Sequence, residues 1–219
     1  MHKTVQNLIA IENQLKSSLG DVNESNLPNI IAVSKTFKID KILPLIEHGH
    51  LHFGENKVQE AIDKWTEIKS NNTSIQLHMI GKLQTNKVKF AVKLFDYIHS
   101  VDSEKLAKKI ADEQLKINKK LKVFIQVNVG DESQKSGINI NETNNLLIVC
   151  KKINLNVIGF MCIPPAGADP TIYFKEMDKI SKINNFKQLS MGMSSDYLKA
   201  AQFNSTYLRI GSNIFGQRY

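Results

Sequence analysis

The chain contains few cysteines, few arginines and no long apolar run. Two of its 219 residues are cysteines, Cys150 and Cys162, and both lie in apolar stretches without metal-ligand spacing. This scarcity argues against a disulfide scaffold and a metal site, and it indicates buried thiols in a reducing compartment. No run approaches the roughly 20 apolar residues that a membrane-spanning helix needs, and the N-terminus has no signal-peptide core. We therefore expect a cytoplasmic protein with no membrane partner and no metal.

Arginine is nearly absent, although the chain is basic. It has two arginines, Arg209 and Arg218, beside 27 lysines, and its formal net charge is +8. Such a charge permits binding to nucleic acid. The lysines, however, are spread over the whole chain, often beside Asn or Ile, and form no dense basic tract. We therefore expect no nucleic-acid partner, and the charge favours a small anionic ligand.

Short apolar runs alternate with helical patterns along the chain, as is typical of parallel α/β folds. An amphipathic helix over 3–19 comes first. The expected strands are 30–34, 51–53, 76–80, 97–101, 123–129, 157–161, 188–191 and 207–210. Eight such units predict a (β/α)8 TIM barrel with an additional N-terminal helix, folded as a single domain over 1–219. A doubly wound open sheet is the competing topology, and the barrel is favoured because the count closes at eight.

Lys35 directly follows the first expected strand. In barrels of this kind, reactive groups sit at the C-terminal ends of the strands, and a lysine amine there can form a Schiff base with an aldehyde cofactor. A lone lysine at a strand end is more often simply solvated. The interpretation of Lys35 therefore depends on what the rest of the chain places beside it.

The last two expected strands both end in Gly/Ser segments, SMGMS and RIGS. Loops after strands seven and eight are where such barrels often bind phosphate. Gly192 and Gly211 allow backbone N–H groups to approach a ligand, and Ser194 and Ser212 add hydroxyl donors. Each segment alone is an ordinary strand-to-helix turn. Together with Lys35, the pair indicates pyridoxal 5'-phosphate (PLP) as cofactor.

Polar groups elsewhere in the chain complete the expected site. Arg209 lies inside an apolar strand, where a guanidinium needs a partner. That partner is either a cofactor ring nitrogen, which the charge would keep unprotonated, or a salt bridge in the barrel wall. Glu55 and Asn56 are expected to reach the barrel mouth, where Asn56 either bonds the cofactor ring or caps the next helix. Lys135 is expected in an exposed loop near the mouth.

Long motifs cover nearly the whole chain in a fixed order: AVSKT (32–36), FGENKVQE (53–60), HMIGKLQTNK (78–87), IHSVDS (98–103), IQVNVGDESQKSG (125–137), GFMCIPP (159–165), LSMGMSSD (189–196) and RIGSNIFGQR (209–218). In these motifs the chain resembles the pyridoxal phosphate homeostasis proteins, which are single-domain PLP-binding barrels. Their barrel is similar to the N-terminal domain of alanine racemase. The resemblance therefore implies the barrel fold and PLP as cofactor.

The resemblance also implies a role for individual residues. Lys35 is the implied Schiff-base lysine. The other implied contacts are Ser194, Gly211 and Ser212 with the phosphate, Arg209 with the pyridine nitrogen, Asn56 near the ring, and Lys135 in handling PLP away from the main site. Two positions depart from the family pattern: Lys82 stands where the family often has His, and Ser212 where it often has Thr. Serine keeps the hydroxyl, so phosphate binding should be retained.

The family implies PLP binding in intracellular vitamin B6 homeostasis, with PLP-dependent apo-enzymes as partners and no established turnover. Racemisation needs an acid/base group on each face of the substrate carbanion, and alanine racemase takes the second from an added domain and its dimer partner. A chain of 219 residues leaves no room for that domain, so we expect no or negligible catalysis. The alternatives are a PLP-dependent racemase or decarboxylase with a single base, and a PLP-independent barrel enzyme acting on a sugar phosphate. We expect a monomer, with a dimer as the alternative.

Overall fold

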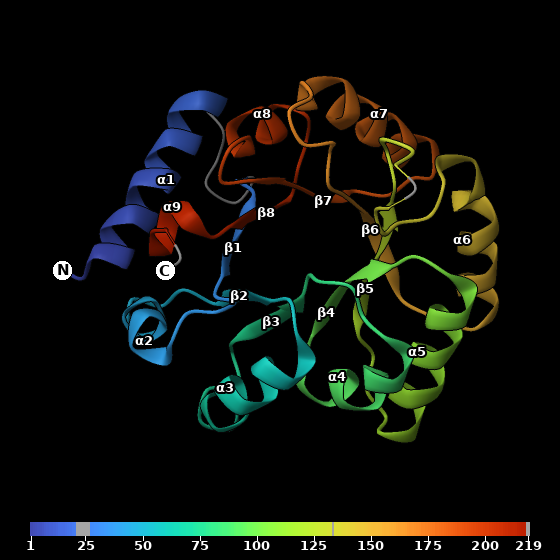
Figure 1. Cartoon of the computed structure of the whole chain (residues 1–219), viewed down its shortest axis with the longest axis horizontal. Coiled ribbons are helices and arrows are strands. Elements are labelled where there is room, and N and C mark those ends of the chain that lie inside the picture. Colours follow the sequence, from blue (N-terminus) through green and yellow to red (C-terminus); the bar gives the residue numbers. More distant parts are fainter. Residues whose placement is uncertain (21–26, 133, 218–219) are drawn as a thin grey trace.

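A closed barrel of eight parallel strands forms the centre of the molecule, as the computed structural model shows (Figure 1). The structure describes residues 1–20, 27–132 and 134–217. The strands follow one another around the barrel in chain order: β1 (Asn29–Val33), β2 (His52–Glu55), β3 (Gln76–Met79), β4 (Tyr97–Val101), β5 (Lys122–Val127), β6 (Val157–Cys162), β7 (Gln188–Met193) and β8 (Tyr207–Ile210). Closure comes from parallel pairing of β1 with β8. The predicted TIM barrel is therefore confirmed, and the open sheet is excluded.

Helices surround the strands, and α1 precedes the barrel as predicted. The helical segments are α1 (Lys3–Leu19), α2 (Ile39–Glu47), α3 (Val58–Asn71), η2 (Thr85–Lys87), α4 (Val88–Leu94), α5 (Glu104–Lys116), η3 (Ile140–Glu142), α6 (Thr143–Lys152), α7 (Pro170–Ile183), α8 (Tyr197–Gln202) and α9 (Ser212–Phe215). Their starts follow capping chemistry. Ser103 Oγ accepts a hydrogen bond from Leu106 N at the start of α5, and Asp169 Oδ1 accepts one from Thr171 N at the start of α7.

Two apolar layers hold the fold together. The larger layer lies between the strands and the helices and includes the fully buried side chains of Phe53, Trp65 and Phe174. The smaller cluster fills the inside of the barrel: Ile31, Val33, Tyr97, Phe124, Met161 and Tyr207. Alternate residues of each strand supply the two layers because successive side chains point to opposite faces. The inside of the barrel is therefore filled with side chains and does not form a pore.

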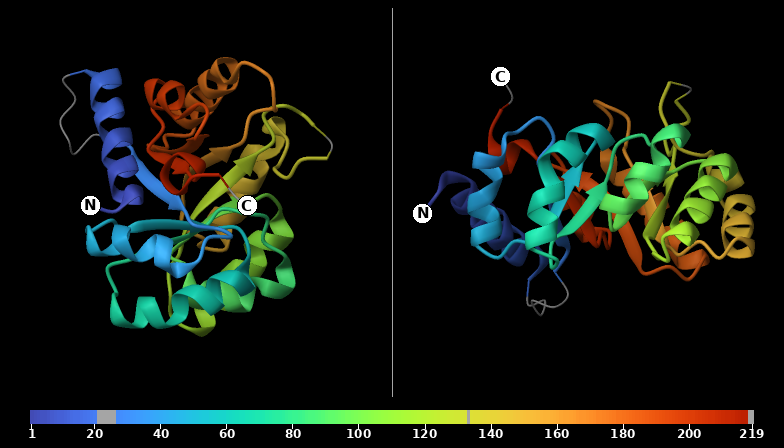
Figure 2. Two further views of the ribbon diagram at one scale, coloured as in Figure 1. Left: turned by 60° about the vertical axis from the view of Figure 1, so that its left-hand side comes forward. Right: turned by 90° about the horizontal axis from the view of Figure 1, so that it is seen from below.

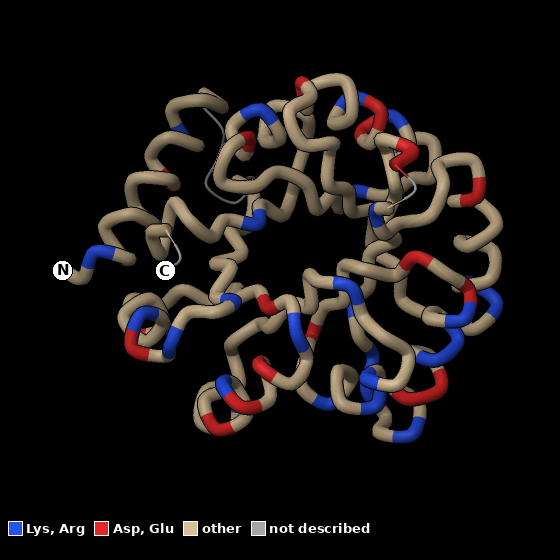
Figure 3. Tube along the Cα trace, in the orientation of Figure 1, with Lys and Arg blue, Asp and Glu red and all other residues tan. Residues whose placement is uncertain are grey.

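Helix α1 lies outside the ring, beside the C-terminal helices α8 and α9 (Figures 1 and 2). Its buried face consists mainly of Val5, Leu8, Ile11 and Leu15. Lysine positions are distributed around the ring of helices with acidic positions between them (Figure 3). Within the part of the chain that the structure describes, no helix is long and apolar enough to cross a membrane.

Candidate functional site

A cavity of about 540 Å³ opens where β1, β2, β7 and β8 end. Six residues singled out from the sequence contribute to its lining: Lys35, Asn56, Ser194, Arg209, Gly211 and Ser212. The structure thus brings together side chains that lie up to 177 positions apart in the chain. Among the described lining residues, Lys35 and Arg209 carry the only charges, and both charges are positive. The cavity therefore suits an anionic ligand.

Strand register explains why these segments meet. Val33 pairs with Gly54 across β1 and β2, and Lys35 and Asn56 follow the ends of these two strands into the cavity. Ala32 pairs with Ile210 across β1 and β8, so Gly211 falls next to Val33. Because parallel strands all end at the same rim, the residues that follow them share one opening.

A buried polar cluster fixes the backbone just before Lys35. Ser34 Oγ donates to Glu55 Oε1 at 2.7 Å, and Lys64 Nζ reaches both the Ser34 carbonyl and Glu55 Oε1 at 2.9 Å. Trp65 Nε1 donates to the same carboxylate oxygen at 3.0 Å. The expectation that Glu55 reaches the barrel mouth is therefore wrong: its fully buried carboxylate bonds to α3 and anchors the strand ends.

Arg209 lies inside the barrel with only 5% of its surface exposed. Its Nη1 donates to Ser190 O at 2.6 Å and to Ser190 Oγ at 2.7 Å, and its Nη2 donates to Cys162 O at 2.8 Å. Burial lowers the pKa of the guanidinium, which nevertheless stays a cation because its intrinsic pKa is so high. No salt bridge of Arg209 is formed among the described residues, so the alternative of a salt bridge in the barrel wall is not supported, and Arg209 brings a positive charge to the cavity lining.

Two backbone N–H groups converge beside the cavity after β8. Gly211 N and Asn213 N donate to Ser194 Oγ at 3.2 and 3.5 Å, and Asn213 Nδ2 donates to Ser194 O at 2.9 Å. The protein itself does not require glycine at position 211. Its φ is −114°, and an added Cβ would lie 3.5 Å from Val33, an ordinary contact. A cavity wall kept free of a side chain is what a closely approaching ligand requires.

One expectation for the segment SMGMS is wrong. Gly192 does not line the cavity; its φ is +93°, and an added Cβ would lie 2.5 Å from Ala200 Cβ of α8. This glycine serves the packing of the helix on β7. Ser190, the first residue of the segment, is fully buried and bonds to Arg209. Only Ser194 and Met193 of the segment contribute to the cavity.

Two lysines discussed above lie outside the cavity lining. Lys135 Nζ forms an ion pair with Glu132 Oε2 at 2.5 Å and donates to Pro164 O at 3.3 Å. Lys82 is exposed. Arg218, the second arginine, lies outside the described residues.

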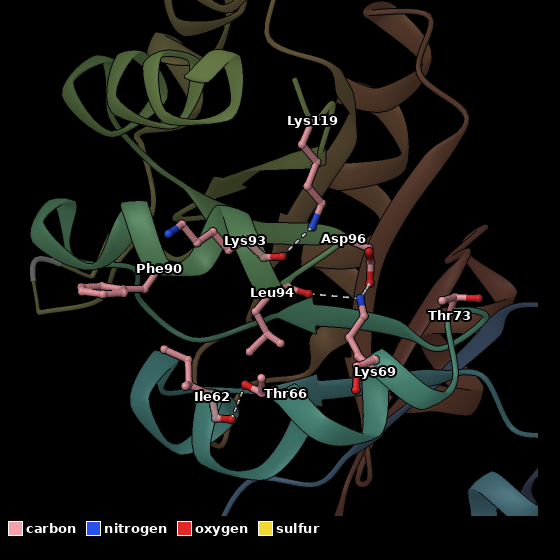
Figure 4. Close-up of a pocket in the computed structure, with 10 residues that line it drawn as sticks. Ile62, Thr66, Lys69, Thr73, Phe90, Lys93, Leu94, Asp96 and Lys119 are labelled. Carbon is pink, nitrogen blue, oxygen red and sulfur yellow. Dashed lines mark hydrogen bonds and ion pairs between the residues drawn. The ribbon is translucent and has the colours of Figure 1, made fainter. Parts of the chain in front are cut away.

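A second cavity of about 570 Å³ lies on the outer wall between α3 and α4 (Figure 4). Two of its lysines and Asp96 are already engaged in hydrogen bonds and an ion pair. Lys69 Nζ donates to Leu94 O and pairs with Asp96, and Lys119 Nζ donates to Lys93 O and Phe95 O. These lysines therefore satisfy the carbonyl groups at the C-terminal end of α4, which have no helical partners. The cavity at the strand ends remains the better candidate site.

Comparison with known proteins agrees with the fold. The family model of the alanine racemase N-terminal domain matches residues 7–219. Alanine racemase of Clostridium difficile superposes with a TM-score of 0.75 at 15% identity, covering 99% of this chain and 57% of that chain. This likeness establishes the class of barrel.

Closer relatives narrow the class to one family. Pyridoxal phosphate homeostasis proteins of Vibrio alginolyticus and Escherichia coli are 34% and 33% identical, over 100% and 86% of this chain and 99% and 85% of those proteins. PipY of Synechococcus elongatus, solved without PLP, superposes with a TM-score of 0.86 at 30% identity, covering 98% of this chain and all of that chain. PipY has also been solved with PLP bound. The chain belongs to the family of pyridoxal phosphate homeostasis proteins.

Sequence reasoning missed two parts of the site. The apolar lining, Ile80, Ile163 and Met193, carries no distinctive residue type and is revealed only by the fold. The second missed part is the set of groups that accept hydrogen bonds from Arg209. These are Ser190 Oγ on β7 and the Cys162 carbonyl on β6. A backbone carbonyl leaves no trace in a sequence, although the isolated arginine in an apolar strand did signal that partners must exist.

Proposed function

We propose that the chain binds PLP in the cavity at the strand ends and serves intracellular vitamin B6 homeostasis, with 1–219 acting as one PLP-binding domain. When bound, PLP supplies an aldehyde that condenses with a lysine amine and a ring that withdraws electrons. In this proposal Lys35 carries the cofactor as a Schiff base. Ser194, Gly211 and Ser212 bind its phosphate, Arg209 faces the pyridine nitrogen, and Asn56 lies near the ring.

The observation that carries the proposal is the composition of one cavity. A lysine, a buried arginine and a wall without a side chain at Gly211 share it, and each matches one part of PLP: the aldehyde, the ring nitrogen and the phosphate. The backbone N–H groups of Gly211 and Asn213, which donate to Ser194 Oγ in the structure, are of the type that phosphate oxygens accept from. The family membership of the chain supports the same cofactor.

We further propose that the chain has no or negligible catalytic turnover. Racemisation needs a proton donor and acceptor on both faces of the substrate. Among the described residues that line the cavity, Lys35 is the only amine, and none is His, Asp, Glu, Tyr or Cys. The positive charge of Arg209 at the ring nitrogen would keep that nitrogen unprotonated, which would weaken the electron withdrawal that carbanion chemistry needs. Both features support storage or delivery of PLP.

The cellular role follows from reversible attachment. We propose that the protein acts as a monomer in the cytoplasm and delivers PLP to PLP-dependent apo-enzymes. Two buried free cysteines, Cys150 and Cys162, suit a reducing compartment. Burial raises the pKa of these thiols to about 11 and about 12, which keeps them unreactive. Lys135, bound to Glu132 and Pro164 outside the cavity lining, is proposed for PLP transfer away from the main site.

Reductive trapping tests the attachment directly. The protein is incubated with PLP, reduced with borohydride, digested and mapped by mass spectrometry. We expect the pyridoxyl adduct on the peptide that contains Lys35, with at most minor labelling of Lys135. Labelling spread evenly over exposed lysines such as Lys82 would contradict a specific site.

A single-base racemase or decarboxylase is the competing function, because Lys35 could serve as that base. The loaded protein is incubated with each of the common amino acids, and the enantiomers and amine products are separated by chiral chromatography. We expect no product above a Lys35→Ala control. Turnover that depends on Lys35 would replace the homeostasis role with an enzymatic one.

A further inference from the structure

A chain of side-chain hydrogen bonds crosses the inside of the barrel and ends at Arg209. It begins at His52 on β2, whose Nδ1 lies 2.9 Å from Nε2 of His78 on β3. His78 Nδ1 lies 2.9 Å from His99 Nε2 on β4, and His99 Nδ1 lies 2.8 Å from Ser190 Oγ on β7. The chain therefore runs from the β2–β4 wall to the β7–β8 wall on the opposite side of the ring (Figure 1).

The two ends of this chain lie in different surroundings. Arg209 lines the candidate PLP cavity at the C-terminal ends of the strands. His52, the first residue of β2, lines a separate cavity of about 370 Å³ beside α1 and the start of β1. The two rings between these ends are held in place by aromatic neighbours: His78 stacks on Tyr97 with centroids 4.1 Å apart, and His99 stacks on Phe124 at 4.4 Å.

The arginine sets the direction of every bond in the chain. A guanidinium can only donate, so Ser190 Oγ must accept from Arg209 Nη1. The hydroxyl hydrogen of Ser190 is then free to point at His99 Nδ1, which accepts it. His99 must carry its hydrogen on Nε2 and donate to His78 Nδ1, and His78 must likewise donate from Nε2 to His52 Nδ1. The reverse direction would leave the buried Ser190 hydroxyl hydrogen without an acceptor among the described contacts, which is costly.

Neutral rings are required for this arrangement. A protonated imidazole has no acceptor nitrogen, so a charged ring would break the chain. Burial lowers the pKa of His78 and His99 well below 6.5, and the nearby Arg209 charge lowers that of His99 further. Burial also lowers the pKa of His52 to about 4.

The hydrogen-bond chain affects the stability of the charge on Arg209. This residue is a buried cation whose described hydrogen-bond acceptors are all neutral. A buried charge without a paired anion is destabilising unless dipoles compensate it. In the direction derived above, the Ser190 hydroxyl and the three imidazoles all turn their acceptor ends toward the guanidinium. Hydrogen bonds aligned in this way polarise one another and strengthen the whole series.

We propose that His52, His78, His99 and Ser190 form a hydrogen-bond chain of one fixed direction that positions Arg209 and supports its charge. The three histidines are positioning residues, since they act on the cavity only through Arg209. The effect on Arg209 does not depend on any ligand. The consequence for a bound pyridine ring, namely that these residues help to set its protonation, rests on the proposed function.

The ligand-free protein is sufficient for the test. Long-range ¹⁵N–¹H spectra of the ¹⁵N-labelled full chain at pH 7.5 report the tautomer of each histidine ring. We expect His52, His78 and His99 to be neutral with the hydrogen on Nε2. A hydrogen on Nδ1 of His78 or His99, a charged ring, or averaging between tautomers would overturn the proposal. This measurement needs no variant, so a variant that fails to fold does not weaken it.

A variant then tests whether the chain acts on the arginine. His78→Phe keeps a ring against Tyr97 but removes both side-chain hydrogen bonds of His78, to His52 and to His99. We expect the Arg209 Nη hydrogens to exchange with water roughly tenfold faster, as for loss of one supporting hydrogen bond. The matched control is His50→Phe. It removes the hydrogen bond between the His50 ring and the His52 carbonyl but leaves the hydrogen bonds from His52 to Arg209 intact.

The Arg209 signals are simple to assign because the protein has only two arginines, and the signals that remain in Arg218→Lys belong to Arg209. Wild-type exchange of Arg209 in His78→Phe, or equal acceleration in His50→Phe, would overturn the positioning role. Neither spectrum involves PLP. Failure of PLP to bind would therefore refute the proposed function and leave this result unaffected, and the reverse also holds.

Discussion

Acidification should unfold this protein through its buried histidines. Burial lowers the pKa of His50 and His52 from 6.5 to about 4, and that of His78 and His99 well below 6.5. Between pH 6.5 and 4 the unfolded chain therefore binds more protons than the folded chain, and stability falls as the pH falls through this window. At pH 5.5 each ring that stays neutral in the fold lowers the free energy of unfolding by about 1.4 kcal/mol.

The four rings together give a loss of about 4 kcal/mol between pH 7.5 and 5.5, with allowance for the partial exposure of His50 and His52. This loss is a large part of the free energy of unfolding of a typical domain, which is about 5–15 kcal/mol. Urea unfolding at pH 7.5, 6.5 and 5.5 measures it. His78→Phe should show a smaller pH-dependent loss by about 1 kcal/mol, because one titrating ring is gone. The exposed His48 provides the control: His48→Gln should follow the wild type. A free energy of unfolding that is constant from pH 7.5 to 5.5 would refute the reasoning.

Three further predictions concern single side chains. Gly211→Ala should leave thermal stability nearly unchanged, because its Cβ meets only an ordinary contact, but weaken PLP binding about tenfold in a fluorescence titration; equal affinity would remove Gly211 from the phosphate site. Glu55→Gln should lower the free energy of unfolding by about 3 kcal/mol, since it removes the fully buried carboxylate that pairs with Lys64 and leaves only the more exposed Glu60 as an anion beside that lysine, whereas Lys108→Gln on a surface pair should change it by less than about 0.5 kcal/mol. Ser190→Ala should accelerate exchange of the Arg209 side chain more than His78→Phe does, because it removes the bond nearest the guanidinium; a smaller effect would mean that the hydroxyl does not support the charge.

The fold followed from local patterns, whereas the orientation of polar side chains did not. The expected strands 97–101 and 207–210 and the expected helix 3–19 coincide with β4, β8 and α1, since each combines a clear periodicity with clear ends. Glu55 and Gly192 were placed in the site wrongly because both lie near a strand end, where one step in register turns a residue from the barrel interior to the helix layer. That register is set by pairing with distant strands.

In the candidate site too, some residues could be predicted from the sequence and others could not. The residues that follow the strands, such as Lys35 and Asn56, were predictable because the barrel topology brings strand ends together. The series of histidines was not predictable, because successive members, His52, His78 and His99, are 26 and 21 positions apart in sequence, and only barrel closure places them in line with Ser190. A buried histidine in an apolar strand is by itself compatible with many roles.

The central claim is that Lys35 holds PLP in the cavity at the strand ends. The most direct measurement is the visible absorption spectrum of the purified protein before and after addition of PLP, with Lys35→Ala and the exposed-lysine control Lys82→Ala measured alongside. The account predicts a Schiff-base band in the wild type and in Lys82→Ala that is absent or strongly altered in Lys35→Ala. No band in the wild type with excess PLP, or an unchanged band in Lys35→Ala, would contradict it.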